Sequence, residues 1–135
     1  MTEVSPEAVE FAHRMFDLAR AGDDVALTAF VDEGVPADLT DSAGNTLLML
    51  AAYHGNVAAV RALLDRGADP DRVNDRGQTA LGAAVFRQSG ESVRALLAAG
   101  ADPDAGGRSA REVAAFFGLE EMTALLASSA TEPPD

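Results

Sequence analysis

The chain has 135 residues, enough for one domain, and it carries a formal net charge of −12 with no cysteine. The lack of cysteine excludes disulfides and thiolate metal sites, and the acidic charge argues against nucleic acid and anionic membranes as partners. No apolar run is long enough to cross a membrane, and the acidic N-terminus lacks the basic flank of a signal peptide, so we expect a cytoplasmic protein.

Residues 5–37 are expected to form the first structural unit, a pair of helices. Ser5-Pro6-Glu7 has the residues of a helix start: a capping side chain, a proline at the first helical position and an acid in the first turn. Apolar residues then recur at helical spacing until Gly22 ends the helix, and the next helix begins at Asp23 or Asp24. The unit is a degenerate, acidic copy of the segments that follow, as the end caps of repeat proteins usually are.

Two segments of the chain, 38–70 and 71–103, match each other at an offset of 33 residues without a gap. The offset pairs Thr46 with Thr79, which are expected to begin a short first helix in each segment. In both segments an apolar second helix follows, and a glycine closes it. A fixed period of this size is the sequence signature of a solenoid, in which neighbouring units bury each other's apolar faces.

Two further features of these segments are expected to be structural. Gly55-Asn56 breaks the first helix of one segment and caps its second helix, and Gln88-Ser89-Gly90 must do the same in the other segment, which lacks the glycine. The paired acids of Asp69-Pro70-Asp71 and Asp102-Pro103-Asp104 recur every 33 residues. This recurrence marks a turn and argues against a catalytic pair of carboxylates.

Residues 104–128 are expected to form a last unit, whose loop is three residues shorter than the loop before it. Ser109 and Glu112 have the spacing of a capping box, and Gly118 separates the two helices of this unit. At the ends of the chain we expect residues 1–4 to be frayed and residues 129–135 to form a disordered tail.

The middle segments share a polar turn ending in Gly-x-Thr, a first helix rich in alanine, a valine followed by two leucines, and Gly-Ala-Asp. This pattern resembles the ankyrin repeat family over residues 5–128. Leu47 and Ala80 stand at the family's proline, and Met49 and Gly82 stand at its histidine, which ties turns together through hydrogen bonds. The resemblance implies a single all-α domain over residues 1–135, an ankyrin-repeat solenoid of stacked helix-turn-helix units with short hairpin fingers and a concave groove.

One row of residues, two positions before the break after each first helix, is a candidate binding surface. In the ankyrin family this position lies on the groove side, and aromatic and arginine side chains are enriched at binding hot spots. The alternative is that these rings pack over the small alanines nearby and only cover the stack. The row and the column beside it comprise Arg20, Tyr53, Phe86 and Phe116, with His54, Arg87 and Phe117.

The finger tips are the family's other contact positions. They are small or polar here, so we expect them to supply hydrogen bonds and register and not affinity; ordinary solvated turns are the alternative. The tips of the two middle fingers comprise Ser42, Ala43, Asn45, Asp75, Arg76 and Gln78. In the shortened fourth finger, Ala105, Gly106 and Arg108 are weaker candidates because the loop reaches less far.

Catalytic and cofactor chemistry has no motif in this sequence. His13 and His54, its two histidines, fall in different repeats, and neither has a second ligand at metal-binding spacing. His54 fits better as a groove residue whose charge makes binding sensitive to pH. No Gly-rich phosphate loop and no Gly-x-Ser-x-Gly elbow occurs. We therefore predict no enzyme activity, no cofactor and no metal.

The function expected from these observations is binding of a folded protein partner through the concave groove and the finger tips. The alternative is an acidic regulator or inhibitor, whose acidic ends bind a basic enzyme or a nucleic-acid-binding protein. In either case the partner is another protein, not nucleic acid or a membrane. We expect a monomer when the chain is free, and the chain can also be one part of a larger assembly.

Overall fold

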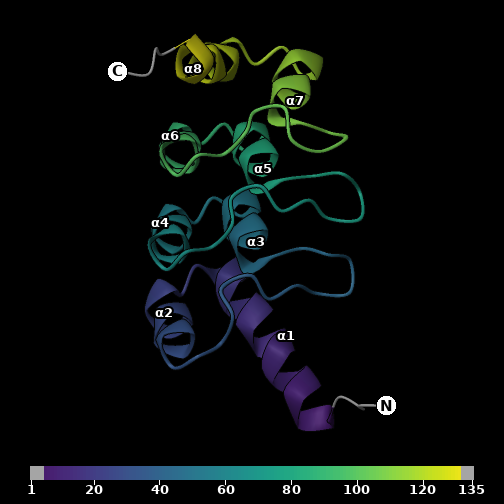
Figure 1. The fold of residues 1–135 in the computed structure, drawn as a ribbon, viewed down its shortest axis with the longest axis vertical. Coiled ribbons are helices and arrows are strands. Elements are labelled where there is room, and N and C mark those ends of the chain that lie inside the picture. Colours follow the sequence, from purple (N-terminus) through teal and green to yellow (C-terminus); the bar gives the residue numbers. More distant parts are fainter. Residues whose placement is uncertain (1–4, 132–135) are drawn as a thin grey trace.

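The computed structural model describes residues 5–131, and this part of the chain is all-α, as the sequence predicts (Figure 1). The predictions for residues 1–4 and 132–135 lie outside the described residues. The helices are α1 (Pro6–Ala21), α2 (Asp24–Asp32), α3 (Leu47–Tyr53), α4 (Val57–Asp65), α5 (Ala80–Phe86), α6 (Gly90–Ala98), α7 (Ala110–Phe116) and α8 (Glu120–Thr131).

Consecutive helices pair as hairpins, and four hairpins stack along the long axis of the molecule (Figure 1). The first helices α1, α3, α5 and α7 form one column, in which each contacts the next, and α2, α4, α6 and α8 form a second column. The loops between hairpins project to one side of the first column as fingers (Figure 1).

One boundary differs from the sequence prediction. Helix α8 continues to Thr131, three residues beyond the end expected for the last repeat at residue 128. No glycine or proline occurs between Gly118 and Pro133, and nothing in this stretch stops a helix from continuing once it has begun.

Side-chain caps begin the helices where the sequence predicts them. Thr46 and Thr79 accept the N–H groups of Met49 and Gly82, and both hydroxyl groups are buried. Ser5 and Asp23 cap α1 and α2 in the same way, and Ser109 and Glu112 make the expected capping box. Each short helix therefore begins at a fixed residue, which sets which of its faces meets the neighbouring hairpin.

The first helices of the last three hairpins all end at a residue with left-handed backbone. This residue is Gly55 (φ 74°) after α3, Gly118 (φ 65°) after α7, and Gln88 (φ 57°) after α5. The prediction that Gln88-Ser89-Gly90 replaces the missing glycine is confirmed, since Ser89 then caps α6. A side chain tolerates this backbone poorly, so the turn at Gln88 is held by its surroundings.

The prediction for Asn56 is only partly right. Asn56 stands at the start of α4, but its side chain makes no capping hydrogen bond there. Its amide instead donates to the carbonyl oxygens of Ala19 and Arg20, each at 2.9 Å, and so satisfies the end of α1 in the preceding hairpin.

The core between the first helices is built from small residues. Ala51 and Ala52 on α3, Ala84 on α5 and Ala114 on α7 are buried where adjacent first helices meet. Leucines and valines fill the space between the two columns, including Leu27, Leu47, Leu48, Val60, Leu63, Leu81, Val85, Val93, Leu96 and Leu126. Small side chains let helix axes approach closely, so neighbouring hairpins share one continuous core.

Hydrogen bonds join successive fingers in this chain, which lacks the family's histidine. Asn74 donates from its amide to Asn45 of the preceding finger at 2.7 Å, and the N–H of Asp75 donates to the carbonyl of Ala43 at 3.0 Å. The residues at the histidine positions, Met49 and Gly82, are buried and contribute packing.

The repeated Asp-Pro-Asp segments are structural, as predicted. The carboxylates of Asp38 and Asp71, each at the start of a repeat, accept the N–H groups of Asp69 and Asp102 at the end of the same repeat, at 2.8 and 2.7 Å. Asp69 also accepts the N–H of Asp71 at 2.9 Å, and the same bond recurs one repeat later. These carboxylates are occupied by backbone donors, which is the role of a turn.

The shortened fourth finger lies directly against the third. The N–H of Arg108 donates to the carbonyl of Gly77 at 3.0 Å. Gly106 has φ 84°, and a Cβ atom added there would lie 2.5 Å from the oxygen of Gly77. Gly107 has open space around its Cα. Only a glycine at position 106 permits this close contact of the two backbones.

We predict that Gly106→Ala lowers the free energy of unfolding by about 1–3 kcal/mol, because it adds both a clash and a strained backbone. Gly107→Ala is the matched control and should change stability by less than about 0.5 kcal/mol. Urea unfolding of the two variants measures the difference. Equal stability of the two variants would show that the fourth finger does not rest on the third as described.

The pKa of the Asp41 carboxylate, in the first of the middle fingers, is lowered from its usual value. Burial by itself raises this pKa, but hydrogen bonds from the backbone and side chain of Asn45 and from the N–H of Ala43, together with the charge of Arg20, leave it below its usual value. The folded state therefore stabilises the charged form of Asp41.

The sign of this pKa shift predicts how the stability depends on pH. The contribution of Asp41 is complete above its unfolded pKa of about 3.9 and is lost as the pH falls through the lower folded pKa. Asp41→Asn should cost about 1 kcal/mol at pH 7, and its difference from the wild type should shrink below about pH 4. Asp75→Asn, an equal charge change in the next finger, is the control; a difference that stays constant down to pH 3 would contradict the prediction.

Candidate functional site

Four exposed aromatic side chains form a continuous row across α3, α5 and α7, which we call the aromatic ladder: Tyr53, Phe86, Phe117 and Phe116. The rings of Tyr53 and Phe86 are stacked, with centroids 6.1 Å apart and planes 3° from parallel. Phe117 meets Phe86 at 5.5 Å and Phe116 at 4.9 Å, both edge to face. Each ring therefore contacts the next, over three repeats.

The ends of the first helices set the direction of these side chains. Tyr53, Phe86 and Phe116 are the last residues of α3, α5 and α7, and the left-handed turn after each one removes the next helical turn. Nothing in the repeat covers them, and they are 50%, 46% and 81% exposed, with Phe117 at 52%. They differ in this respect from Leu47, Leu48 and Leu81 of the same helices, which are fully buried.

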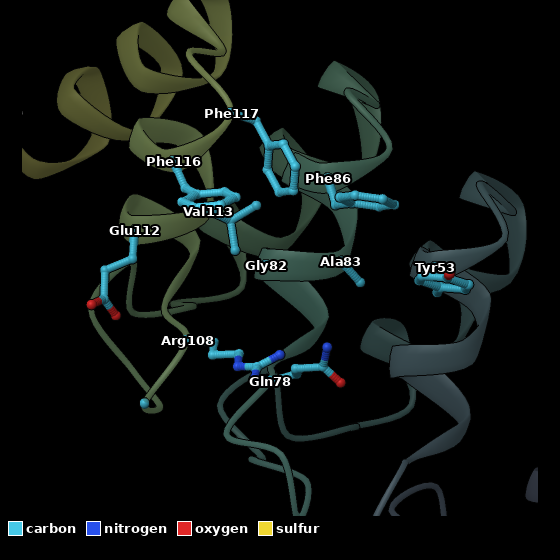
Figure 2. A pocket seen from close by; sticks show the side chains of 11 residues that line it. Tyr53, Gln78, Gly82, Ala83, Phe86, Arg108, Glu112, Val113, Phe116 and Phe117 are labelled. Atoms are coloured by element: carbon cyan, nitrogen blue, oxygen red, sulfur yellow. The ribbon is translucent and has the colours of Figure 1, made fainter.

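A groove with a volume of about 640 Å³ lies between the aromatic ladder and the fingers. Its floor is α5 at Gly82 and Ala83, and Gln78 and Arg108 reach it from the fingers (Figure 2). The full lining comprises Tyr53, Gln78, Gly82, Ala83, Phe86, Gly107, Arg108, Glu112, Val113, Phe116 and Phe117. The groove is therefore apolar on its helical side and polar on its finger side.

Arg108, which the sequence offers only as a weaker candidate, lies in the groove lining. The short fourth finger was expected to make this residue a weak candidate, but the contact with Gly77 places Arg108 beside Gln78 at the groove (Figure 2). An alignment of the fourth repeat from Ser109 with Thr79 puts Arg108 in the same column as Gln78. That alignment is the sequence signal that could have identified it.

The other members of the predicted row lie outside the groove lining. Arg20 is paired with Asp17 at 2.9 Å on α1. His54 stands edge to face against Tyr53 at 5.3 Å, and Arg87 lies against Gly55 at the turn after α3. The structure thus divides the predicted row into a central aromatic ladder and a polar border.

The finger-tip candidates fall into two groups, those whose side chains bond to other finger residues and those that are only exposed to solvent. Asn45 bonds to Asp41 and Asn74, so its side chain serves the fingers themselves. Gln78 accepts from Asn74 at 2.9 Å and is still exposed at the groove. The remaining four tips are exposed to solvent: Ser42, Ala43, Asp75 and Arg76.

One ion pair of the outer surface joins Arg66, after α4, to Asp32 at the end of α2 at 2.8 Å. On the α2–α4 side a hydrogen bond from Arg66, together with its charge, lowers the pKa of Asp32, and the same bond raises the pKa of Arg66.

Among residues 5–131 no group of three histidine, cysteine or acidic side chains is placed to hold a metal ion. No helix in this part of the chain has the length and apolar character needed to cross a membrane.

Two comparisons with known proteins agree with this architecture. A family profile described as ankyrin repeats, in three copies, matches residues 15–106, from the middle of α1 into the fourth finger. A Pseudomonas aeruginosa protein named for ankyrin repeats (PA3287) is 44% identical to the chain over 54 residues. The aligned part covers 40% of this chain and 32% of that protein, so the match spans about a third of the relative's length.

The exposure of the aromatic ladder predicts that its rings contribute little to stability. Tyr53→Ala and Phe86→Ala should each lower the free energy of unfolding by less than about 1 kcal/mol, because half of each side chain is already in water. Leu81→Ala, one turn before Phe86 and fully buried, should cost about 2–5 kcal/mol. Thermal unfolding followed by circular dichroism compares them. A loss at Tyr53 or Phe86 as large as that at Leu81 would mean that the rings pack the stack.

Proposed function

This chain belongs to the ankyrin repeat family, and we propose that it binds a folded protein partner through the groove and the finger tips, without performing chemistry. The family's repeats generally mediate interactions between proteins. The observation that carries the proposal for this chain is the aromatic ladder, four adjacent rings left about half exposed or more at the edge of a groove.

Exposed aromatic rings in contact with one another are unusual on a surface that stays free. Large side chains with few rotatable bonds bury much area at a small cost in entropy, so they dominate binding energy at protein interfaces. The ladder lies on helix ends held by the shared core, so the rings are in place before a partner arrives and binding requires little ordering. The exposed finger tips add polar groups at its border.

The groove lining supports a binding role in preference to catalysis. It contains one carboxylate, Glu112, whose Oε1 accepts hydrogen bonds from the N–H and the hydroxyl of Ser109 at 3.1 Å. This carboxylate serves as a helix cap, and the lining pairs no nucleophile with a base. We propose a scaffold or adaptor. The cytoplasmic location and the monomeric free state stay predictions.

The proposal predicts that single ring truncations weaken partner binding by about 1–3 kcal/mol each, with little change in stability. In an affinity pull-down from source-cell lysate, proteins retained by the wild type should be lost with the Tyr53/Phe86/Phe116 triple alanine variant. A Val9/Val25 double alanine variant removes exposed apolar side chains from the first hairpin and is the control. If the triple variant retains the same proteins as the wild type, the groove is not the binding site.

The alternative function, binding of a basic partner through acidic ends, has the net charge of −12 in its favour. Ionic strength separates the two functions, because salt screens exposed charges and affects apolar contacts little. We expect the affinity for the retained partner to change only a few-fold between low and physiological salt. A steep loss of affinity that the ring variants do not alter would favour the acidic ends.

A further inference from the structure

The arginines of this acidic chain divide into two groups. Five are engaged in ion pairs: Arg20, Arg61, Arg66, Arg72 and Arg111. Among residues 5–131 the other five have no ion pair: Arg14, Arg76, Arg87, Arg94 and Arg108. Three of the unpaired arginines, Arg76, Arg87 and Arg108, belong to the fingers or to the border of the aromatic ladder. The groove lining itself holds one arginine, Arg108, and one carboxylate, Glu112.

Arg108 is the arginine that lies in the groove itself. Its guanidinium stands beside the amide of Gln78, opposite the rings of Phe86 and Phe116 across the floor (Figure 2). The carboxylate of Glu112 points away from the rings and is bound to Ser109 (Figure 2). The guanidinium of Arg108 therefore has no acidic partner within the described chain, and its planar set of donors fits a carboxylate with two parallel hydrogen bonds.

We infer that the groove takes an acidic segment of the partner protein, one that places an apolar side chain against the aromatic ladder and a carboxylate against Arg108. The inference rests on the proposed function and specifies the chemistry of the partner. Consecutive rings of the aromatic ladder have centroids 6.1, 5.5 and 4.9 Å apart. An extended chain covers about 3.3 Å per residue, so the ladder is no longer than roughly five residues of extended chain. A short segment therefore fills it.

Single-stranded nucleic acid is the other macromolecule that exposed rings and arginines can hold, by stacking its bases. Binding of that kind depends on several cationic contacts along the phosphate chain. The groove lining has one arginine, and the acidic charge of the rest of the chain opposes a polyanion at long range. A protein segment with a single carboxylate carries less charge than a phosphate chain and meets less of this opposition.

The test uses a random library of 12-residue peptides displayed on phage, selected against the whole wild-type chain. We expect the selected peptides to pair an aromatic or leucine side chain with a nearby Asp or Glu. Changing that acid to its amide in the synthetic peptide should weaken binding about tenfold, as should Arg108→Glu in the protein. Changing the acid to lysine should restore affinity for Arg108→Glu. Arg94→Glu, the same charge change on α6 away from the groove, is the matched control and should leave affinity unaltered.

Each other outcome contradicts a stated part of the inference. Selected peptides that lack an acid but lose affinity with Tyr53→Ala and Phe86→Ala would overturn the acidic segment and leave the proposed function standing. Failure to select any peptide would count against both. Equal losses from Arg108→Glu and Arg94→Glu would reduce the effect to long-range charge. Tighter binding of a fluorescent oligo-dT than of the selected peptide would identify single-stranded nucleic acid, and not a protein segment, as the ligand of the groove.

Discussion

The constraint on which this structure depends is that no helix hairpin can bury its apolar surface alone. Each first helix has small residues where its neighbours approach, such as Ala51 and Ala52 on α3 and Ala84 on α5, and these are buried only because another hairpin lies against them. The ties between repeats follow the same logic. The amide of Asn74 bonds to Asn45 of the preceding repeat, and the carboxylates of Asp38 and Asp71 each tie the start of a repeat to its end. Stability is therefore a property of the stack, and each interface supports those beside it.

The same constraint creates the groove. Because the first helices are equal in length from α3 to α7 and end at equivalent turns, the side chain at the last position emerges at the same height in each repeat. A solvent-facing residue that stood alone would be unremarkable, but stacking brings Tyr53, Phe86 and Phe116 into one row with Phe117 between the last two repeats. The shortened fourth finger forms one side of the groove, because Gly106 allows the backbone of this finger to lie against Gly77. The buried core and the exposed aromatic ladder thus use different faces of the same helices, so the exposed residues can change without a change in the core.

The sequence predicted those features that arise from local chemistry or from the repeat itself. The caps at Thr46, Thr79 and Ser109, the turn at Gln88 and the all-α stack follow from residue type and the 33-residue period, and the structure confirms them. Features that depend on contacts between repeats could not be predicted from the sequence. Asn56 was assigned to its own helix and bonds to the end of α1, and Arg108 was discounted for its short loop although that loop brings it to the groove. The hydrogen bond from the side-chain amide of Asn74 to that of Asn45 joins two fingers, and nothing in the sequence of either finger alone would pair these residues.

Hydrogen exchange of the chain alone and in complex with its protein partner tests the central claim most directly, because it locates the contact surface without any substitution. The account predicts that the bound partner slows exchange at the C-terminal ends of α3, α5 and α7 and in the fingers at residues 71–79 and 104–109. The outer helices α2, α4 and α6 should exchange as they do in the free chain. Slower exchange confined to the outer helices or to the two ends of the stack, with the fingers unchanged, would contradict the account.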